Sequence, residues 1–170
     1  MTTAEQVTVA VRPAELRDVH AIQEIDAQVY PTPWSEKLTI DQVTGPGRVH
    51  LVVEEQHRVI GHGGIAILDG DAHITTVAID PVHHRRGLGS VLVTHLLQAA
   101  EENGCRAVTL EVRVSNRAAI AMYEKHGLES AGIRPGYYGD NGEDALVMWS
   151  REGLGVERQW SDSDGLETDA

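Results

Sequence analysis

AIDPVHHRRGLGSVLVTHLL, residues 78–97, is the stretch of sequence that decides the fold. Its first residues are apolar and end at Asp80-Pro81, which is typical of a strand that stops at a turn. From Gly87 to Glu102 apolar side chains recur at steps of three and four, which predicts an amphipathic helix that ends at Asn103-Gly104. The expected apolar face of this helix consists of Leu88, Val91, Leu92, Leu96 and Ala99.

The loop before this helix has the composition of a phosphate site. Gly87 and Gly89 allow the backbone to approach a ligand closely, so successive N–H groups and the positive end of the helix can hold a pyrophosphate. Arg85 and Arg86 add positive charge. An ordinary helix start with two glycines fits the same residues. The chain has neither G-x-x-x-x-G-K-S/T nor G-x-G-x-x-G, so two common nucleotide loops are excluded.

Upstream of this stretch the sequence predicts one strand and two helices. Residues 7–12 (VTVAVR) alternate and end at Pro13, so we expect an opening strand and then a helix from about Ala14. Ser35 is a suitable N-cap for a second, shorter helix, which Gly45-Pro46-Gly47 ends. The first helix has one apolar stripe, formed by Leu16, Val19, Ile22, Ile25 and Val29.

Further strands and helices alternate along the rest of the chain. Polar turns separate three apolar runs, which predicts antiparallel strands at 49–54, 58–68 and 72–80. Downstream of the long helix we expect three more elements: a strand at 106–112, a helix at 116–126 opened by Ser115, and a last strand at 144–149. This order predicts a mixed α/β (α+β) fold.

Length, composition and charge suit one acidic domain. The 170 residues are 41% hydrophobic, which is enough for one core with helices on both faces of a sheet. We expect this domain to span residues 1–150 and the acidic residues 151–170 to form a flexible tail. The formal net charge of −12 disfavours nucleic acid as a partner, because phosphate contacts need clustered Lys and Arg.

Three further features concern location and metals. Cys105 is the only cysteine, so no disulfide can form within the chain, and we expect a small buried side chain in a reducing compartment. No secretory signal and no apolar run of about 18 residues occurs, which predicts a cytoplasmic protein without a membrane partner. The nine histidines show no H-x-x-x-H spacing, so we expect no metal site.

Three separated motifs resemble one family of enzymes. The loop His84-Arg85-Arg86-Gly87-Leu88-Gly89 after VAIDP resembles the acetyl-CoA loop Gln/Arg-x-x-Gly-x-Gly/Ala of the GNAT acetyltransferases. LEVRVSNRAAIAMYEKHGL, followed by RPGYYGDNGEDALVM, is similar to the signature of bacterial ribosomal-protein-alanine N-acetyltransferases and their archaeal N-terminal acetyltransferase relatives, and YPTPWS matches a third segment of that family. The similarity covers about residues 7–149. His84 and Leu128 depart from it, where the family usually has Gln or Arg and Phe.

This resemblance implies a fold and a cofactor site. The GNAT fold is a mixed, mostly antiparallel sheet of about six to seven strands with helices on both faces, and the co-substrate is acetyl-CoA. Backbone N–H groups of the strand before the loop would receive the acetyl carbonyl and the pantetheine, and those of the loop would hold the pyrophosphate. The cofactor-binding residues implied are Val77, Ala78, Ile79, Arg85, Arg86, Gly87, Leu88, Gly89, Ser90 and Asn116.

Two side chains are candidates for proton transfer. Acyl transfer from a thioester needs a base for the amine and an acid for the departing thiolate. The resemblance implies that Glu111 is the base and Tyr123 the acid. The residue pattern alone also fits an exposed Glu111 paired with Arg113 or Arg106, a core position for Tyr123, and a helix cap at Ser115-Asn116.

The leading hypothesis is acetylation of a protein N-terminus, with the N-terminal alanine of a small-subunit ribosomal protein as the substrate that the resemblance implies. An α-amine has a pKa of about 8 and a lysine about 10.4, so the ammonium of an N-terminal acceptor gives up its proton to a base more readily than that of a lysine does. A lysine, a polyamine or an antibiotic amine remains an alternative acceptor, and an acetyl-CoA-binding module without turnover remains an alternative class. Tyr137-Tyr138 and Glu143-Asp144 fit either a peptide-binding loop or an ordinary loop with a solvated charge pair.

Overall fold

The computed structural model describes residues 8–151. Over this range the chain forms seven strands, four α-helices and two short 3-10 helices. In chain order these are β1 (Val9–Pro13), η1 (Leu16–Asp18), α1 (Val19–Val29), α2 (Glu36–Thr44), β2 (Arg48–Glu55), β3 (Arg58–Leu68), β4 (Asp71–Ile79), η2 (Pro81–His83), α3 (Leu88–Glu102), β5 (Ala107–Arg113), α4 (Arg117–Lys125), β6 (Glu129–Arg134) and β7 (Ala145–Arg151).

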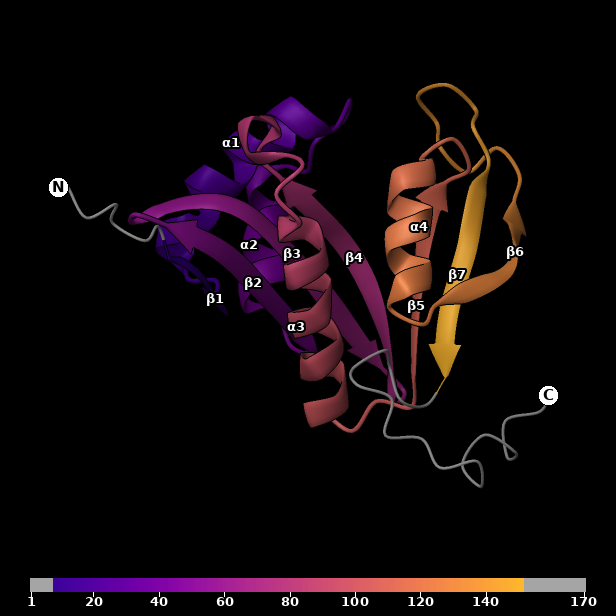
Figure 1. Cartoon of the computed structure of the whole chain (residues 1–170). Coiled ribbons are helices and arrows are strands. Elements are labelled where there is room, and N and C mark those ends of the chain that lie inside the picture. The colour runs from indigo at the N-terminus through magenta and orange to yellow at the C-terminus, as the bar shows by residue number, and fades with distance from the viewer. Residues whose placement is uncertain (1–7, 152–170) are drawn as a thin grey trace, which may run out of the picture.

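The seven strands form one sheet in the order β1-β2-β3-β4-β5-β7-β6. All neighbouring pairs are antiparallel except β4 and β5. Helix α3 packs on β2, β3 and β4 from one face, and α1 and α2 pack on the same strands from the other face (Figure 1). The expected fold class, a mixed and mostly antiparallel sheet with helices on both faces, is therefore confirmed.

Two neighbouring residues of β3 show what each face of the sheet holds. His62 points towards α1, where its Nε2 lies 2.6 Å from Asp26 Oδ1. Gly63 points towards α3, because a Cβ placed there would lie 3.1 Å from Leu92 Cδ2 and 3.2 Å from Leu96 Cδ1. Side chains alternate between the two faces along a strand, so α1 and α3 lie on opposite sides, and α3 packs close to the sheet.

The main apolar core lies between the sheet and α3. Leu88, Leu92 and Leu96 are buried there as expected, whereas Val91 is 41% exposed and does not belong to the buried face. Leu16 is also outside its expected stripe, because it lies in η1 before α1 begins and is 61% exposed. Cys105 is buried at the edge of the core, as expected.

The expected strands and helices are present, with differences at their ends and one omission. Strand β6 was not expected, because each of its residues is exposed and its sequence lacks the apolar alternation that signals a strand. Asn116, rather than Ser115, caps α4, since its side chain accepts a hydrogen bond from the N–H of Ala119. Residue 7 of the expected first strand, and residues 152–170 of the expected tail, lie outside the described residues.

No helix within residues 8–151 is both long and apolar enough to span a membrane.

Candidate active site

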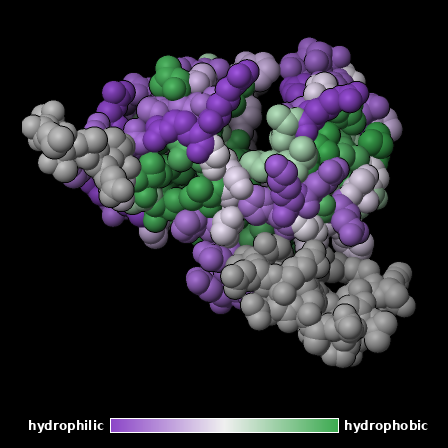
Figure 2. Space-filling view, viewed as in Figure 1, coloured by the Kyte–Doolittle hydropathy of each residue, from purple (hydrophilic) through white to green (hydrophobic). Residues whose placement is uncertain are grey.

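Strands β4 and β5 separate after a short parallel contact. Only residues 71–73 of β4 pair with residues 107–109 of β5, so the strands diverge beyond that point (Figure 1). A cleft of about 860 Å³ lies at this divergence. Its lining comes from β4, β5, α4, the end of α1, the segment 30–34 and the segment 137–140. Figure 2 shows the surface hollowed between the two halves of the molecule.

Glu111 enters the cleft from the sheet face that α1 covers. Its neighbours Leu110 and Val112 point into the α3 core, so the alternation of the strand turns Glu111 to the opposite side. The carboxylate is largely buried, with 11% of the side chain exposed; it lies 3.0 Å from His73 Nε2 and forms an ion pair with Arg134 Nε at 3.3 Å. Both expected alternative partners, Arg113 and Arg106, bind other groups.

His73 is a cleft residue that sequence reasoning missed. Its Nδ1 lies 3.0 Å from Thr109 Oγ1 of β5, and its Nε2 contacts Glu111, so both ring nitrogens have partners across the short parallel pair. The imidazole lines the cleft, and 40% of the side chain is exposed. A histidine in the middle of a strand gives no local signal, because the contact depends on the pairing of β4 with β5.

Tyr123 reaches the cleft from the opposite face, on α4. It is buried, with 7% of the residue exposed, and belongs to the core cluster that contains α3. Burial, followed by the nearby Tyr30 and Tyr138, raises the pKa of this phenol above its ordinary value, so its hydroxyl stays protonated at neutral pH. Among the hydrogen bonds within the described part of the chain, none involves this hydroxyl.

Strand β4 presents a free backbone edge to the cleft. The Tyr30 hydroxyl donates to Val77 O at 3.2 Å, and His84 Nε2 donates to Ile79 O at 2.8 Å, so both carbonyls face away from β3. In a strand the N–H and C=O of one residue point to the same edge. The N–H groups of Val77 and Ile79 therefore face the open edge, while the alternation turns the N–H of Ala78 towards β3.

The irregularity of β4 lies at Thr75. The register with β3 shifts there, since Gly64 is opposite Thr76 and Ile65 is opposite Ile74. Such a bulge places one extra residue in the strand and increases its twist. Val77, Ala78 and Ile79 themselves pair with β3 in regular register.

The glycine loop holds unpaired backbone N–H groups at the start of α3. Arg85 has φ 65° and Gly87 has φ 75°, so the chain turns twice through the left-handed region before the helix. The first intrahelical bond runs from Val91 N to Gly87 O. Within the described residues no backbone or side-chain acceptor meets the N–H groups of Leu88, Gly89 and Ser90, as is normal for a first helical turn.

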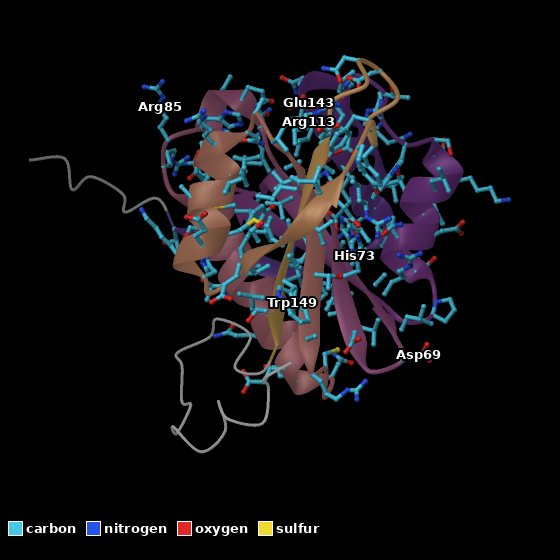
Figure 3. All side chains as sticks on the ribbon, turned by 90° about the vertical axis from the view of Figure 1, so that its right-hand side faces the viewer. Asp69, His73, Arg85, Arg113, Glu143 and Trp149 are labelled. Atoms are coloured by element: carbon cyan, nitrogen blue, oxygen red, sulfur yellow. The ribbon has the colours of Figure 1, made fainter. Side chains whose placement is uncertain are left out.

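The two arginines of the loop differ in their orientation. Arg85 points away from the fold (Figure 3). Arg86 pairs with Glu55 of β2 and lies 2.8 Å from His83 Nδ1, so the structure turns its guanidinium away from the helix start. The expected charge contribution of Arg86 is therefore not seen in this arrangement.

Gly89 of α3 and Asn116 at the start of α4 lie where these two helices meet beside the cleft. A Cβ at Gly89 would lie 3.3 Å from Met122 Sδ of α4, so the absence of a side chain allows the two helices to approach. The Asn116 side chain lines the cleft while its oxygen caps α4, which leaves its amide N–H₂ free to donate. Ser90 Oγ lies 3.3 Å from His126 Nε2, so this hydroxyl also faces α4.

Arg113 holds the β6–β7 loop over the cleft. Its guanidinium donates to both carboxylate oxygens of Asp140 at 2.9 and 3.0 Å and to Glu143 Oε1 at 3.3 Å (Figure 3). Its Cζ lies 4.0 Å from the centroid of the Tyr138 ring. Asp144 Oδ1 accepts from Gly136 N, which closes the loop. Glu143 and Asp144, which the sequence left open as peptide-site residues or a solvated charge pair, therefore order a loop whose residues 137–140 line the cleft.

Residues 8–151 contain no group of three or more His, Cys, Asp or Glu side chains placed to hold a metal ion.

Comparison with known proteins identifies similar chains. The sequence profile of the family described as "Acetyltransferase (GNAT) family" matches residues 19–128. A relative in Bacillus subtilis (strain 168) is 39% identical over 141 residues, which cover 82% of this chain and 93% of the relative. The ribosomal protein bS18-alanine N-acetyltransferase of Escherichia coli (strain K12) is 35% identical over 136 residues, which cover 79% of this chain and 91% of that enzyme.

A solved structure agrees with these sequence matches. The crystal structure of the ribosomal-protein-S18-alanine N-acetyltransferase from Escherichia coli superposes with a TM-score of 0.80 at 30% sequence identity. The match covers 91% of this chain and all of that structure.

Proposed function

This chain belongs to the acetyltransferase (GNAT) family, and we propose that it transfers the acetyl group of acetyl-CoA to the N-terminal α-amine of a protein. The observation that supports the proposal best is the cleft between β4 and β5. The Glu111 carboxylate enters it from one face of the sheet, and the protonated Tyr123 phenol enters it from the other. Acyl transfer from a thioester needs both groups, one to accept a proton and one to donate a proton.

Acetyl-CoA would lie on the face that α3 and α4 share. The backbone N–H groups from Arg85 to Ser90 would hold the pyrophosphate, because a helix start with free N–H groups binds anions. The Asn116 amide would donate to the pantetheine. The N–H groups of Val77 and Ile79 would meet the pantetheine and the acetyl carbonyl, and hydrogen bonds at that oxygen stabilise the charge that forms there. Acetyl-CoA supplies the thioester.

Glu111 would accept the proton of the attacking amine, and His73 would orient its carboxylate. The contact with His73 Nε2 at 3.0 Å holds the carboxylate at the edge of the cleft. Tyr123 would give its proton to the departing thiolate, since the raised pKa keeps the phenol protonated until the sulfur takes the proton. The two faces of the sheet thus separate the incoming amine from the leaving group.

The acceptor would approach from the face of α1. There the segment 30–34 and the loop residues 137–140 form the walls of the cleft, with the rings of Tyr137 and Tyr138 packed edge to face. The E. coli relative is named for the alanine of ribosomal protein bS18. We therefore infer an N-terminal alanine of a ribosomal protein as the natural acceptor, which would place the enzyme in the cytoplasm.

A peptide panel tests this function. The full chain is incubated with acetyl-CoA and peptides that begin with alanine, and the products are read by mass spectrometry. One set has a free α-amine, and a matched set has a blocked α-amine and an internal lysine. We expect acetyl transfer to the free α-amine alone. Transfer confined to lysine would reject the N-terminal acceptor, and coenzyme binding without any product would reject the enzyme.

Glu111→Gln tests the base. The amide keeps the size of the side chain and cannot take the proton, so we expect kcat at neutral pH to fall by about 10² to 10⁴. The KM for acetyl-CoA should stay near the wild-type value, since Glu111 lies on the other face of the sheet. A wild-type kcat from this variant would refute the base assignment.

A further inference from the structure

Three buried titratable side chains form a hydrogen-bonded row that runs from the cleft into the sheet. Asp26 of α1 lines the cleft, and its Oδ1 lies 2.6 Å from His62 Nε2 of β3. His62 Nδ1 lies 2.9 Å from His50 Nε2 of β2. The three residues are 2%, 0% and 4% exposed, in the order Asp26, His62, His50. No motif of the sequence analysis and no step of the proposed reaction uses them.

The hydrogen bonds align the three side chains. An ionised Asp26 only accepts, so His62 Nε2 donates to it, and His62 Nδ1 and His50 Nε2 share one proton between them. Burial, together with the nearby His62, lowers the pKa of His50 to about 3, so this imidazole is neutral at pH 7. Each imidazole therefore orients its neighbour, and the row of hydrogen bonds ends on the Asp26 carboxylate at the cleft.

This arrangement leaves one buried atom without a partner. His50 Nδ1 has no hydrogen bond within the described residues, and a Cβ at Gly64 would lie 2.4 Å from it. A buried polar atom without a partner costs free energy, and so does a buried carboxylate. Such an unsatisfied group needs an explanation, and a role in catalysis is one.

Two protons leave the acceptor's nitrogen in this reaction. An α-amine with a pKa of about 8 arrives mostly as an ammonium at pH 7. Its nitrogen must lose one proton before attack and a second proton when the amide forms, while the thiolate takes up only one. The same face of the sheet carries two carboxylate–imidazole pairs, Glu111 with His73 and Asp26 with His62, and both carboxylates line the cleft.

We propose that Asp26 is a second catalytic carboxylate, which takes the first proton from the acceptor's ammonium directly or through one water. The N–H bond breaks, its electron pair stays on the nitrogen, and the proton goes to Oδ2 of Asp26. Oδ1 continues to accept from His62 throughout. His62 and His50 are positioning residues. The inference rests on the proposed function, because it assigns a step of that same reaction.

The groups that face Asp26 are few. His62 of β3 is its direct partner, with His50 of β2 behind it, and Tyr30 lies one turn further along α1. Burial raises the pKa of Tyr30, so it is neutral at pH 7. Ala78 of β4 is the register partner of His62, and the buried Thr76 of β4 and Thr39 of α2 are uncharged.

Asp26→Asn is the main test, because the amide keeps the shape and removes the acceptor. We expect kcat/KM for an alanine-first peptide to fall on the order of tenfold to a hundredfold at pH 7. The loss should shrink by pH 9, where the amine arrives neutral. Acetyl-CoA affinity should be unchanged. A wild-type rate at pH 7, or an equal loss at pH 7 and pH 9, would overturn the proposal.

Two variants of His62 separate positioning from packing. His62→Gln can still donate to Asp26 and accept from His50, whereas His62→Leu can do neither. We expect the Gln variant to recover much of the neutral-pH activity that the Leu variant loses. Identical pH profiles from these two variants would contradict the proposal, and this pair decides the question if Asp26→Asn does not fold.

His20→Gln is the matched control, because His20 lies on the same helix with 85% of its side chain exposed. It should behave as the wild type at every pH. Failure of the wild-type chain to acetylate any α-amine would reject the proposed function itself, whereas an active wild type with an unaffected Asp26→Asn variant would reject only the role of Asp26.

Discussion

At the scale of single residues, burial gives Tyr123 its chemical character. A phenol inside the core loses the solvation that its anion would need, so its pKa rises and the hydroxyl keeps its proton. The proposed role of Tyr123 is therefore that of a proton donor at the cleft. The same burial would leave a purely structural tyrosine equally protonated, so kinetics must distinguish the two roles.

Tyr123→Phe removes only the hydroxyl. We expect kcat to fall by about 10² or more, with acetyl-CoA affinity within about twofold of the wild type, because the ring still fills its place in the core. Thiol release in steady state and coenzyme titration check the two parts. Because the raised pKa keeps the phenol protonated, wild-type activity should show no loss from this group between pH 7 and pH 10. An unchanged kcat would assign Tyr123 to the core alone.

His50 should make the stability of the molecule depend on pH. Its pKa is about 3 when folded and about 6.5 when unfolded, so between these values the unfolded state binds more protons. Stability is therefore complete above about pH 6.5 and is lost as the pH falls towards 3, at up to about 1.4 kcal/mol per pH unit.

The variant His50→Gln cannot titrate, so the free energy of unfolding in urea should fall less steeply between pH 6.5 and pH 4.5 than it does for the wild type. The exposed His20→Gln variant should keep the wild-type slope. Equal slopes for the wild type and His50→Gln would show that His50 is protonated in the folded state.

The family resemblance, and not the residue pattern alone, implied Glu111 and Tyr123 as the candidate pair, and both line one cleft. Sequence reasoning did not identify His73, Asp26 or Tyr30. The contacts of these three residues cross between elements that lie far apart in the chain, as in the pair formed by Asp26 and His62. A local pattern of residues holds no information about such contacts.

At the scale of elements, the β6–β7 loop is ordered by Arg113 of β5. One guanidinium holds Asp140, Glu143 and the ring of Tyr138. Nη2 of this guanidinium reaches both oxygens of Asp140 while Nη1 reaches Glu143, so several charge-assisted hydrogen bonds from one side chain hold the loop. The wall of the cleft that would contact the peptide therefore depends on a side chain that lies on a strand.

Arg113→Ala should release this loop. We expect the KM for an alanine-first peptide to rise roughly tenfold, which corresponds to about 1.4 kcal/mol, while the KM for acetyl-CoA stays constant. Arg106→Ala is the control, because Arg106 is largely exposed and its ion pair with Asp71 is 3.8 Å long. If both variants keep the wild-type KM for the peptide, the loop does not form part of the acceptor site.

Helix α3 packs on β3 where glycine leaves room for it. A Cβ at Gly63 would lie 2.9 Å from Thr76 O and close to two leucines of α3, so backbone or helix must move. Gly63→Ala should lower the free energy of unfolding by about 1 to 3 kcal/mol. Gly139→Ala is the control, since nothing lies within 4 Å of a Cβ there. Urea unfolding of both variants measures the difference, and equal stabilities would contradict this account of the packing.

Most elements were predictable because their apolar periods are strong. Helix α3 and strands β2 to β5 and β7 follow local patterns. Strand β6 is fully exposed, so it has no such pattern and depends on its partner β7. Val91 fits the helical period, yet it is exposed. The period alone could not predict this, since it does not determine how wide the buried stripe is.

At the scale of the whole molecule, one short contact creates the site. The sheet is continuous, yet β4 and β5 pair over three residues only. Their divergence exposes the edge of β4 and lets groups from both faces of the sheet meet. The resemblance to a family implied a mixed, mostly antiparallel sheet with helices on both faces, but the divergence of β4 and β5 was not predicted, since composition and periodicity hold no information on where two strands stop pairing.

The most direct test is a crystal structure of the full chain with a bisubstrate analogue, in which coenzyme A is joined through an acetyl group to the α-amine of an alanine-first peptide. We expect the acetyl group between Val77 and Glu111, the pyrophosphate on the N–H groups from Arg85 to Ser90, and the peptide on the face of α1. An analogue bound outside the β4–β5 cleft, or a peptide that leaves on the α3 face, would contradict the account.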